Sequence, residues 1–223
     1  MKKITVFYGN YGSGKTELSL SVALELAREH DDVSLVDLDI VNPYFRSSEH
    51  RSMLERHGVR LIAPAFANTG VDLPTIPPDI YAAFKGGHVV FDCGGDPVGA
   101  TALGGLKERF ERVRYDTEVL FVVNTKRPFQ ENAQRIMESF ERVQSSARLT
   151  ADGFVLNSNL GTGTTGDELP EDYEIMKELE ALTGVPLLYV SGTESSLERF
   201  KKQHPEYDGG FITLGILTRP EWL

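Results

Sequence analysis

The sequence predicts an α/β fold: a doubly wound, mostly parallel sheet with helices on both faces. Three observations support this prediction. Strand-like and helix-like segments alternate along the chain, most strand-like segments are continuous apolar runs, and a glycine-rich turn joins the first strand to the first helix. Continuous apolar runs are typical of strands that are buried on both faces, as in parallel sheets covered by helices.

The elements follow from hydrophobic periodicity and from the residues that interrupt it. Strands, recognised by β-branched and aromatic runs, are expected at residues 3–8, 33–38, 60–63, 88–91, 118–123, 154–156 and 186–190. Helices, recognised by apolar residues at helical spacing, are expected at residues 16–28, 46–57, 79–84, 103–113, 130–143 and 171–182. The Pro-rich segment 64–78 and the Gly/Thr-rich segment 161–166 are expected to be loops. Because no repeat or linker is evident, residues 1–223 are expected to form a single domain.

Composition narrows the classes of protein to which the chain can belong. The chain has 223 residues, of which 40% are hydrophobic and 25% are charged, as in an ordinary globular protein. Its formal net charge of −10 argues against a general nucleic-acid or anionic-membrane binder. A single cysteine, Cys93, excludes an intramolecular disulfide and favours a reducing compartment. No apolar run is long enough for a membrane span or a signal peptide, so we expect a cytoplasmic protein.

Residues 9–16, Gly-Asn-Tyr-Gly-Ser-Gly-Lys-Thr, match the P-loop pattern G-x-x-x-x-G-K-[ST] at every fixed position. Glycines let the backbone curl so that its N–H groups point at phosphate oxygens, and the following helix adds its positive N-terminal end. Lys15 is expected to reach the β- and γ-phosphates, and Thr16 to place its hydroxyl on Mg²⁺. The predicted nucleotide-binding residues of this segment are Gly9, Asn10, Tyr11, Gly12, Ser13, Gly14, Lys15, Thr16 and Glu17.

Two acidic segments follow predicted strands and are candidates for holding magnesium. Asp92 ends an apolar strand, as in the Walker B pattern, and the D-x-x-G spacing places the Gly95 N–H where a γ-phosphate could be sensed. Asp37 and Asp39 lie two residues apart and face the same side if the strand continues. We assign the positioning of the attacking water or of a magnesium water to Asp39, with Asp37 as the alternative. The predicted metal-binding residues are Thr16, Asp39 and Asp92, and the predicted catalytic residues are Lys15 and Asp39.

The chain resembles the SIMIBI class of P-loop proteins, the ATPases grouped with MinD, ParA, the nitrogenase iron protein and the cobyrinate amidases. The resemblance rests on three motifs in order: the P-loop, the Asp-x-Asp pair and the Asp-x-x-Gly segment. The resemblance extends over about residues 3–190. It implies that the P-loop strand lies beside the strand of Asp92, that Asp39 belongs to switch I and that residues 92–95 form switch II. It also implies that Asn157 contacts adenine. Many members carry a second lysine where this chain has Asn10, so a nucleotide-sandwich dimer that needs this lysine is not implied. A homodimer remains open.

A further motif bears on which base the nucleotide carries. GTP-specific P-loop proteins commonly carry Asn-Lys-x-Asp after a late strand, and the carboxylate accepts from the guanine ring. Residues 124–127, Asn-Thr-Lys-Arg, and residues 157–160, Asn-Ser-Asn-Leu, both lack this pattern. The sequence therefore favours Mg-ATP.

Two functions fit these motifs. The first is a nucleotide switch: an ATPase, slow without its partner, whose ATP and ADP states present different surfaces to a partner protein. The second is a small-molecule kinase or an ATP-dependent ligase, in which residues 64–78 and 95–105 build an acceptor pocket and Arg46 and Arg51 bind an anionic substrate. Cys93 is interpreted as a buried structural thiol, the alternative being a metal or cluster shared between two copies.

Overall fold

The computed structural model describes residues 1–39, 50–63, 78–95, 97–159 and 168–215. These residues form an eight-stranded sheet in the order β3-β2-β4-β1-β5-β6-β7-β8, and all of its neighbouring strands pair in parallel. The strands are β1 (Ile4–Gly9), β2 (Val33–Leu38), β3 (Val59–Ile62), β4 (His88–Cys93), β5 (Thr117–Val123), β6 (Gly153–Leu156), β7 (Leu187–Gly192) and β8 (Gly210–Thr213). The helices are α1 (Lys15–Leu26), α2 (Arg51–Arg56), α3 (Pro78–Ala83), α4 (Pro97–Gly104), α5 (Lys107–Arg112), α6 (Ala133–Ala147), α7 (Glu168–Thr183) and α8 (Glu194–Gln203), with a 3₁₀ turn η2 (Arg114–Asp116).

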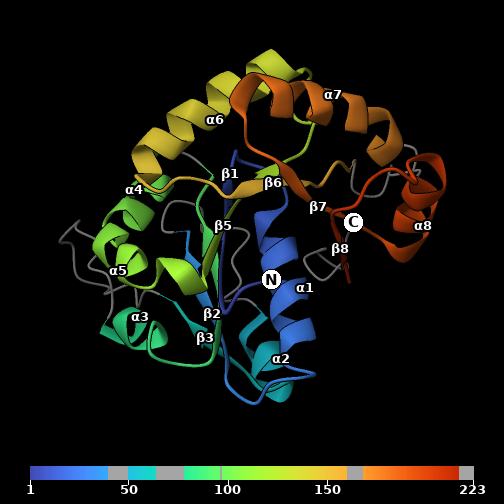
Figure 1. The fold of residues 1–223 in the computed structure, drawn as a ribbon. Coiled ribbons are helices and arrows are strands. Elements are labelled where there is room, and N and C mark those ends of the chain that lie inside the picture. Colours follow the sequence, from blue (N-terminus) through green and yellow to red (C-terminus); the bar gives the residue numbers. More distant parts are fainter. Residues whose placement is uncertain (40–49, 64–77, 96, 160–167, 216–223) are drawn as a thin grey trace.

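Helices cover both faces of the sheet (Figure 1). Successive residues of each strand point to opposite faces, so the alternation within β1 separates two cores. Val6 packs in the core that includes residues of α3 to α8, and Phe7 packs in the core that includes residues of α1 and α2. Burial on both faces explains why the strands read as continuous apolar runs, and the predicted α/β fold class is confirmed.

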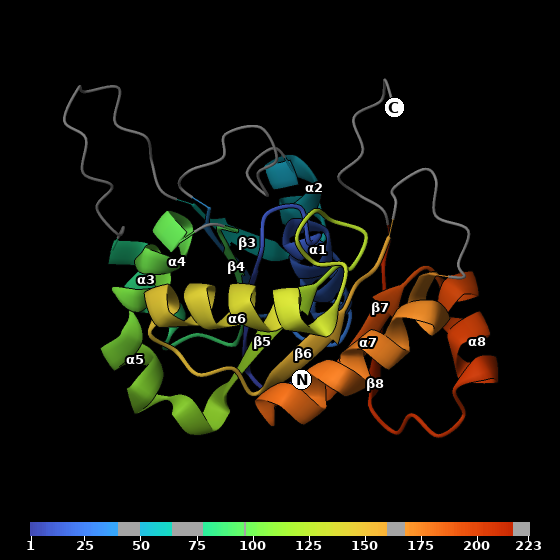
Figure 2. The same cartoon turned by 90° about the horizontal axis from the view of Figure 1, so that it is seen from above.

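The parallel strands present all their carboxyl ends at one edge of the sheet. Figure 2 shows the turn from β1 to α1 at this edge, with the N-terminus of the chain near the opposite edge. β1 has β4 on one side and β5 on the other: the chain goes from β1 to β2 and β3 on the first side, returns to β4, and then crosses to β5 on the second side, so the strand order changes direction around β1. In open α/β sheets, ligands bind at the carboxyl ends of the strands beside such a reversal.

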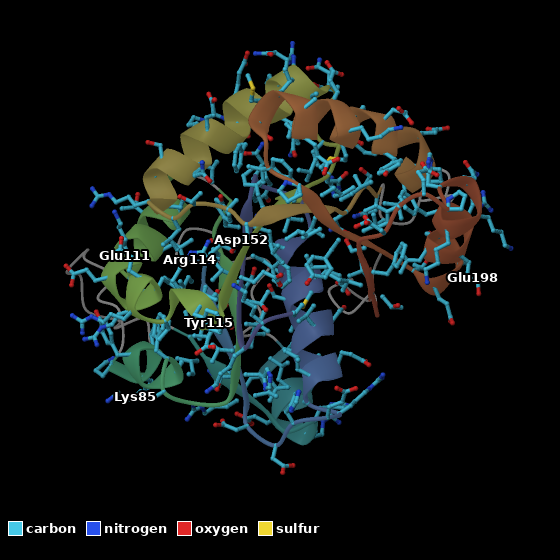
Figure 3. The ribbon with its side chains drawn as sticks, viewed as in Figure 1. Lys85, Glu111, Arg114, Tyr115, Asp152 and Glu198 are labelled. Carbon is cyan, nitrogen blue, oxygen red and sulfur yellow. The ribbon has the colours of Figure 1, made fainter. Side chains whose placement is uncertain are left out.

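An ion pair fixes the opposite edge of the sheet. Arg114, just before β5, donates two hydrogen bonds to the carboxylate of Asp152, just before β6, at 2.9 and 2.6 Å. Figure 3 labels both side chains, Arg114 and Asp152, which lie next to each other. Asp152 also accepts the Val119 N–H at 2.7 Å, so the pair holds the starts of two neighbouring strands in register.

The structure differs from the predicted elements at three places. The helix expected at residues 103–113 is two helices, α4 and α5, separated at Gly104-Gly105. A Cβ at Gly104 would lie 3.0 Å from the Ser146 carbonyl oxygen, so the close approach to the end of α6 favours glycine there. The sequence analysis also missed α8 and β8. Thr193 accepts the Ser196 N–H at 3.3 Å and begins α8, in which Leu197 and Phe200 are buried. Part of the helix expected at 46–57, most of the loop expected at 64–78 and all of the loop expected at 161–166 lie outside the described residues.

Candidate functional site

The P-loop forms the turn between β1 and α1. Gly14, which immediately precedes α1, has φ of 87°, in the left-handed region, and a Cβ there would lie 2.3 Å from Asn157 Nδ2. Both conditions favour glycine at this position. No side chain caps the start of α1, as is usual where backbone N–H groups at a helix N-terminus receive an anion.

Lys15 lies at the junction between the P-loop and the segment after β4. Its side chain is buried, and Nζ donates to the Asn10 carbonyl oxygen at 2.9 Å. A Cβ at Gly95 would lie 2.9 Å from Nζ and 2.6 Å from the Tyr11 backbone nitrogen, so only a glycine fits this approach without displacing its neighbours. The structure thus places Gly95 against the P-loop, as the D-x-x-G spacing predicts.

A pair of buried carboxylates lies beside Lys15. Asp37 on β2 and Asp92 on β4 are partners in register, and both are buried. Burial, with the neighbouring Asp37 carboxylate as the second cause, raises the pKa of Asp92 to about 8, while the Thr16 hydroxyl and the Lys15 ammonium act in the opposite direction. Thr16 is close enough to act on this carboxylate, but neither Asp92 oxygen has a hydrogen bond of normal geometry to the described residues.

These residues fit a magnesium ion. Mg²⁺ prefers oxygen ligands, one or two carboxylates and substrate phosphates. A buried carboxylate with two unpartnered oxygens beside a hydroxyl offers such ligands, and a cation would compensate the repulsion between Asp92 and Asp37. Asp39 lies at the same edge, where its N–H donates to Asp37 Oδ1 at 3.0 Å, and a Cβ at Gly94 would lie 3.3 Å from Asp39 Oδ1.

Asn157 lies directly against the P-loop. Its Nδ2 donates to the Ser13 carbonyl oxygen at 2.8 Å, and its Oδ1 accepts from the Ser191 hydroxyl at 2.9 Å. The side chain is buried. In the structure, therefore, both ends of this amide bind other parts of the chain, and its proposed contact with adenine stays a prediction.

Two further residues, Ser191 and Arg127, join this site without a sequence motif to identify them. Ser191, at the end of β7, holds Asn157, and Arg127, after β5, donates from Nε to the Gly12 carbonyl oxygen at 2.9 Å. Asp37, the alternative to Asp39 in the sequence analysis, raises the pKa of Asp92 more than Asp39 does. The register between β2 and β4 pairs Asp37 with Asp92, and two-residue spacing alone could not choose between the two acids.

The loop after β5 is anchored to α7 by a buried carboxylate. Lys126 Nζ donates to Asp172 Oδ1 at 3.0 Å, and the Thr125 hydroxyl donates to Oδ2 of the same side chain. Asp172 is buried, so both of its oxygens serve this internal contact. Lys126, which lies next to the place where a guanine-reading lysine would stand, is thereby held by the protein.

Cys93 is completely buried, in the core on the face of the sheet opposite Asp92, as interpreted from the sequence. Burial raises the pKa of its thiol, and the neighbouring Asp92 adds to this effect. Within the described ranges, no group of three or more His, Cys, Asp or Glu side chains has the arrangement of a metal site. No helix in the same ranges is long and apolar enough to cross a bilayer.

Neither a protein-family model nor a curated protein matches the sequence. Solved structures do resemble the fold. FtsY from Mycoplasma mycoides is 16% identical, with 86% of this chain and 61% of that chain covered and a TM-score of 0.53. The signal recognition particle receptor FtsY from Elizabethkingia anophelis, in complex with GDP, is 17% identical, with 86% and 57% covered and a TM-score of 0.53. The signal recognition particle 54 kDa protein from Aeropyrum pernix, in complex with GDP, is 20% identical, with 89% and 49% covered and a TM-score of 0.52.

The chain thus spans about half to three-fifths of the length of these structures. At identities this low, the structural similarity shows a common fold and nothing more. The eight-stranded parallel sheet with its covering helices has the architecture of these structures. The chain accordingly has a P-loop NTPase-like α/β fold, which it shares with these structures.

Proposed function

We propose that this protein is a Mg-ATP-dependent switch of the MinD/ParA type, a slow ATPase that acts on a partner protein. One observation carries the proposal: Gly95 lies against both Tyr11 and Lys15 of the P-loop, closer than any side chain would allow. A γ-phosphate bound at Lys15 would contact this junction, and its loss would change how the segment after β4 packs. The exposed surface would then differ between the triphosphate and diphosphate states.

The roles of the residues follow from their positions. Lys15 and the N–H groups of the P-loop stabilise the charge that develops on the β–γ bridging oxygen and on the γ-oxygens. Thr16 and Asp92 would hold Mg²⁺, directly or through water, and the ion would supply positive charge to the phosphate oxygens. Asp39 positions the attacking water, with Asp37 placed to share this task because it lies beside Asp92.

ATP is the proposed nucleotide because neither segment that could carry a guanine-reading carboxylate has one. Asp172, which approaches Lys126 from α7, is engaged by Lys126 and Thr125. GTP is the alternative, since two of the similar structures are complexes with GDP. We also propose a single domain in a cytoplasmic setting.

The proposal is tested by incubating the purified protein with Mg-ATP or Mg-GTP and measuring diphosphate release beside size-exclusion chromatography in each state. We expect slow release of ADP, a change in size or protease sensitivity between ATP and ADP, and neither effect in Lys15→Ala. Equal affinity and rate in Lys15→Ala would refute the P-loop assignment. Faster turnover of GTP than of ATP would overturn the choice of base and leave the switch intact.

A small-molecule kinase or ATP-dependent ligase is the second candidate. It is favoured by Asn10, which stands where many switch ATPases of this class carry a second lysine. Such an enzyme would release ADP only when an acceptor is present, and its size would not change with the nucleotide. Arg51, considered for the acceptor, pairs with Glu55 at 3.7 Å and donates to the Leu61 carbonyl oxygen at 3.4 Å, which makes it a weaker candidate for substrate binding.

A further inference from the structure

A second concave site lies at the other end of the sheet from the P-loop. Its volume is about 530 Å³, within the usual range for pockets that hold small molecules. Asp32 precedes β2, Arg60 lies near the start of β3, and Lys85 precedes β4, so the amino-terminal ends of three neighbouring strands form part of its lining. Tyr81 of α3 and Arg109 of α5 also line the pocket. Figure 3 shows Lys85 at the rim of the molecule, in the turn after α3.

The lining is positively charged on a strongly acidic chain. Arg60, Lys85 and Arg109 contribute three cations, against the single carboxylate of Asp32, while the whole chain has a net charge of −10. The Asp32 carboxylate already has a partner within the protein, because its Oδ2 accepts a hydrogen bond from the Gly87 N–H at 2.6 Å. Among the described residues, none of the three cations forms an ion pair, whereas Arg28, Lys107, Arg135 and Lys177 each pair with a glutamate on their own or an adjoining turn.

Two of the three cations are held in place by neutral groups. The guanidinium carbon of Arg109 lies 5.2 Å from the centre of the Tyr81 ring. Arg60 Nε donates to the Ser34 hydroxyl at 3.2 Å. These contacts orient the guanidinium groups without neutralising them, and an oriented guanidinium binds carboxylate or phosphate oxygens in pairs.

We propose that this pocket binds a small anion with at least two acidic groups, either phosphates or carboxylates. The ligand would bridge Arg60 and Arg109, with Lys85 at the open side. The site is distinct from the P-loop, because β2 and β4 separate it from Asp37 and Asp92 at their carboxyl ends. The inference does not depend on the nucleotide or on the function proposed above.

The test is calorimetric titration with two probes, pyrophosphate and citrate, which separate a phosphate-binding site from a polycarboxylate-binding site. Both are titrated into the Lys15→Ala protein, so that the P-loop does not compete for pyrophosphate. We expect at least one probe to bind with saturation. Arg109→Ala and Lys85→Ala should each weaken that binding about tenfold, the loss expected for one charge-assisted contact.

Arg112→Ala is the matched control, since Arg112 is an exposed arginine on the same helix as Arg109 and does not line the pocket. It should leave the affinity within about twofold, as expected for a surface change away from the site. Lys85 is exposed, so its variant tests the pocket even if an arginine variant folds poorly. Failure of both probes to bind, or an equal loss in Arg112→Ala and Arg109→Ala, would overturn the proposal.

Discussion

Asn157→Ala separates two roles for this residue, bracing the P-loop and reading the base. The substitution removes the donor to the Ser13 carbonyl oxygen and the acceptor for the Ser191 hydroxyl. Ser13 and Ser191 are both buried, so each group left without this partner costs about 1–3 kcal/mol. Since Ser191 also donates to the Leu156 carbonyl oxygen at 3.1 Å, its share of the loss is the smaller one. We expect the free energy of unfolding to fall by about 2–4 kcal/mol.

The effect on nucleotide binding follows from where Ser13 lies. Its peptide belongs to the loop that surrounds the phosphates, so loosening it should weaken ATP, GTP and pyrophosphate by a similar factor, about tenfold if 1.4 kcal/mol of preorganisation is lost. Denaturant unfolding measures the stability, and calorimetry measures the three affinities. Ser191→Ala is the graded control, because it leaves the Asn157 donor to Ser13 in place and should lower affinity much less. A changed ratio of ATP to GTP affinity with unchanged pyrophosphate binding would refute the bracing argument and assign Asn157 to the base.

Asp39→Ala should lower the turnover number far more than the affinity for Mg-ATP, because the carboxylate is proposed to act on the attacking water; equal losses in steady-state kinetics and in titration would count against that role. Gly95→Ala should weaken triphosphate binding more than diphosphate binding, since its Cβ would lie 2.6 Å from the Tyr11 backbone, whereas Gly86→Ala, whose Cβ would meet its nearest atom at 3.5 Å, should leave both unchanged. Burial raises the pKa of Asp92 to about 8, so the folded state keeps a proton that the unfolded chain has lost. The nucleotide-free protein should therefore lose stability as pH rises from about 4 to 8, by as much as roughly 5 kcal/mol, and Asp92→Asn should flatten this profile in denaturant titrations at several pH values. The same slope in both proteins would show that Asp92 does not titrate in this range.

The sequence was sufficient for the fold class and for the P-loop because both depend on local patterns. Continuous apolar runs such as residues 118–123 indicate strands buried on both faces, and the eight residues from Gly9 to Thr16 carry their glycines and lysine at fixed spacing. The elements that were missed or merged have weaker local signals. α8 has only a few apolar residues, and α4 ends at Gly104, which lies close to the end of α6.

Tertiary structure decided which distant side chains meet. The sequence by itself determined that a phosphate-binding loop follows a buried strand, because that chemistry lies within eight consecutive residues. It could not determine that Asp37 stands beside Asp92, that Asn157 braces Ser13, or that Arg60 and Arg109 line one pocket. Each of these pairs joins separate strands or helices, and their contact depends on the strand order and register of the sheet, which no local spacing specifies.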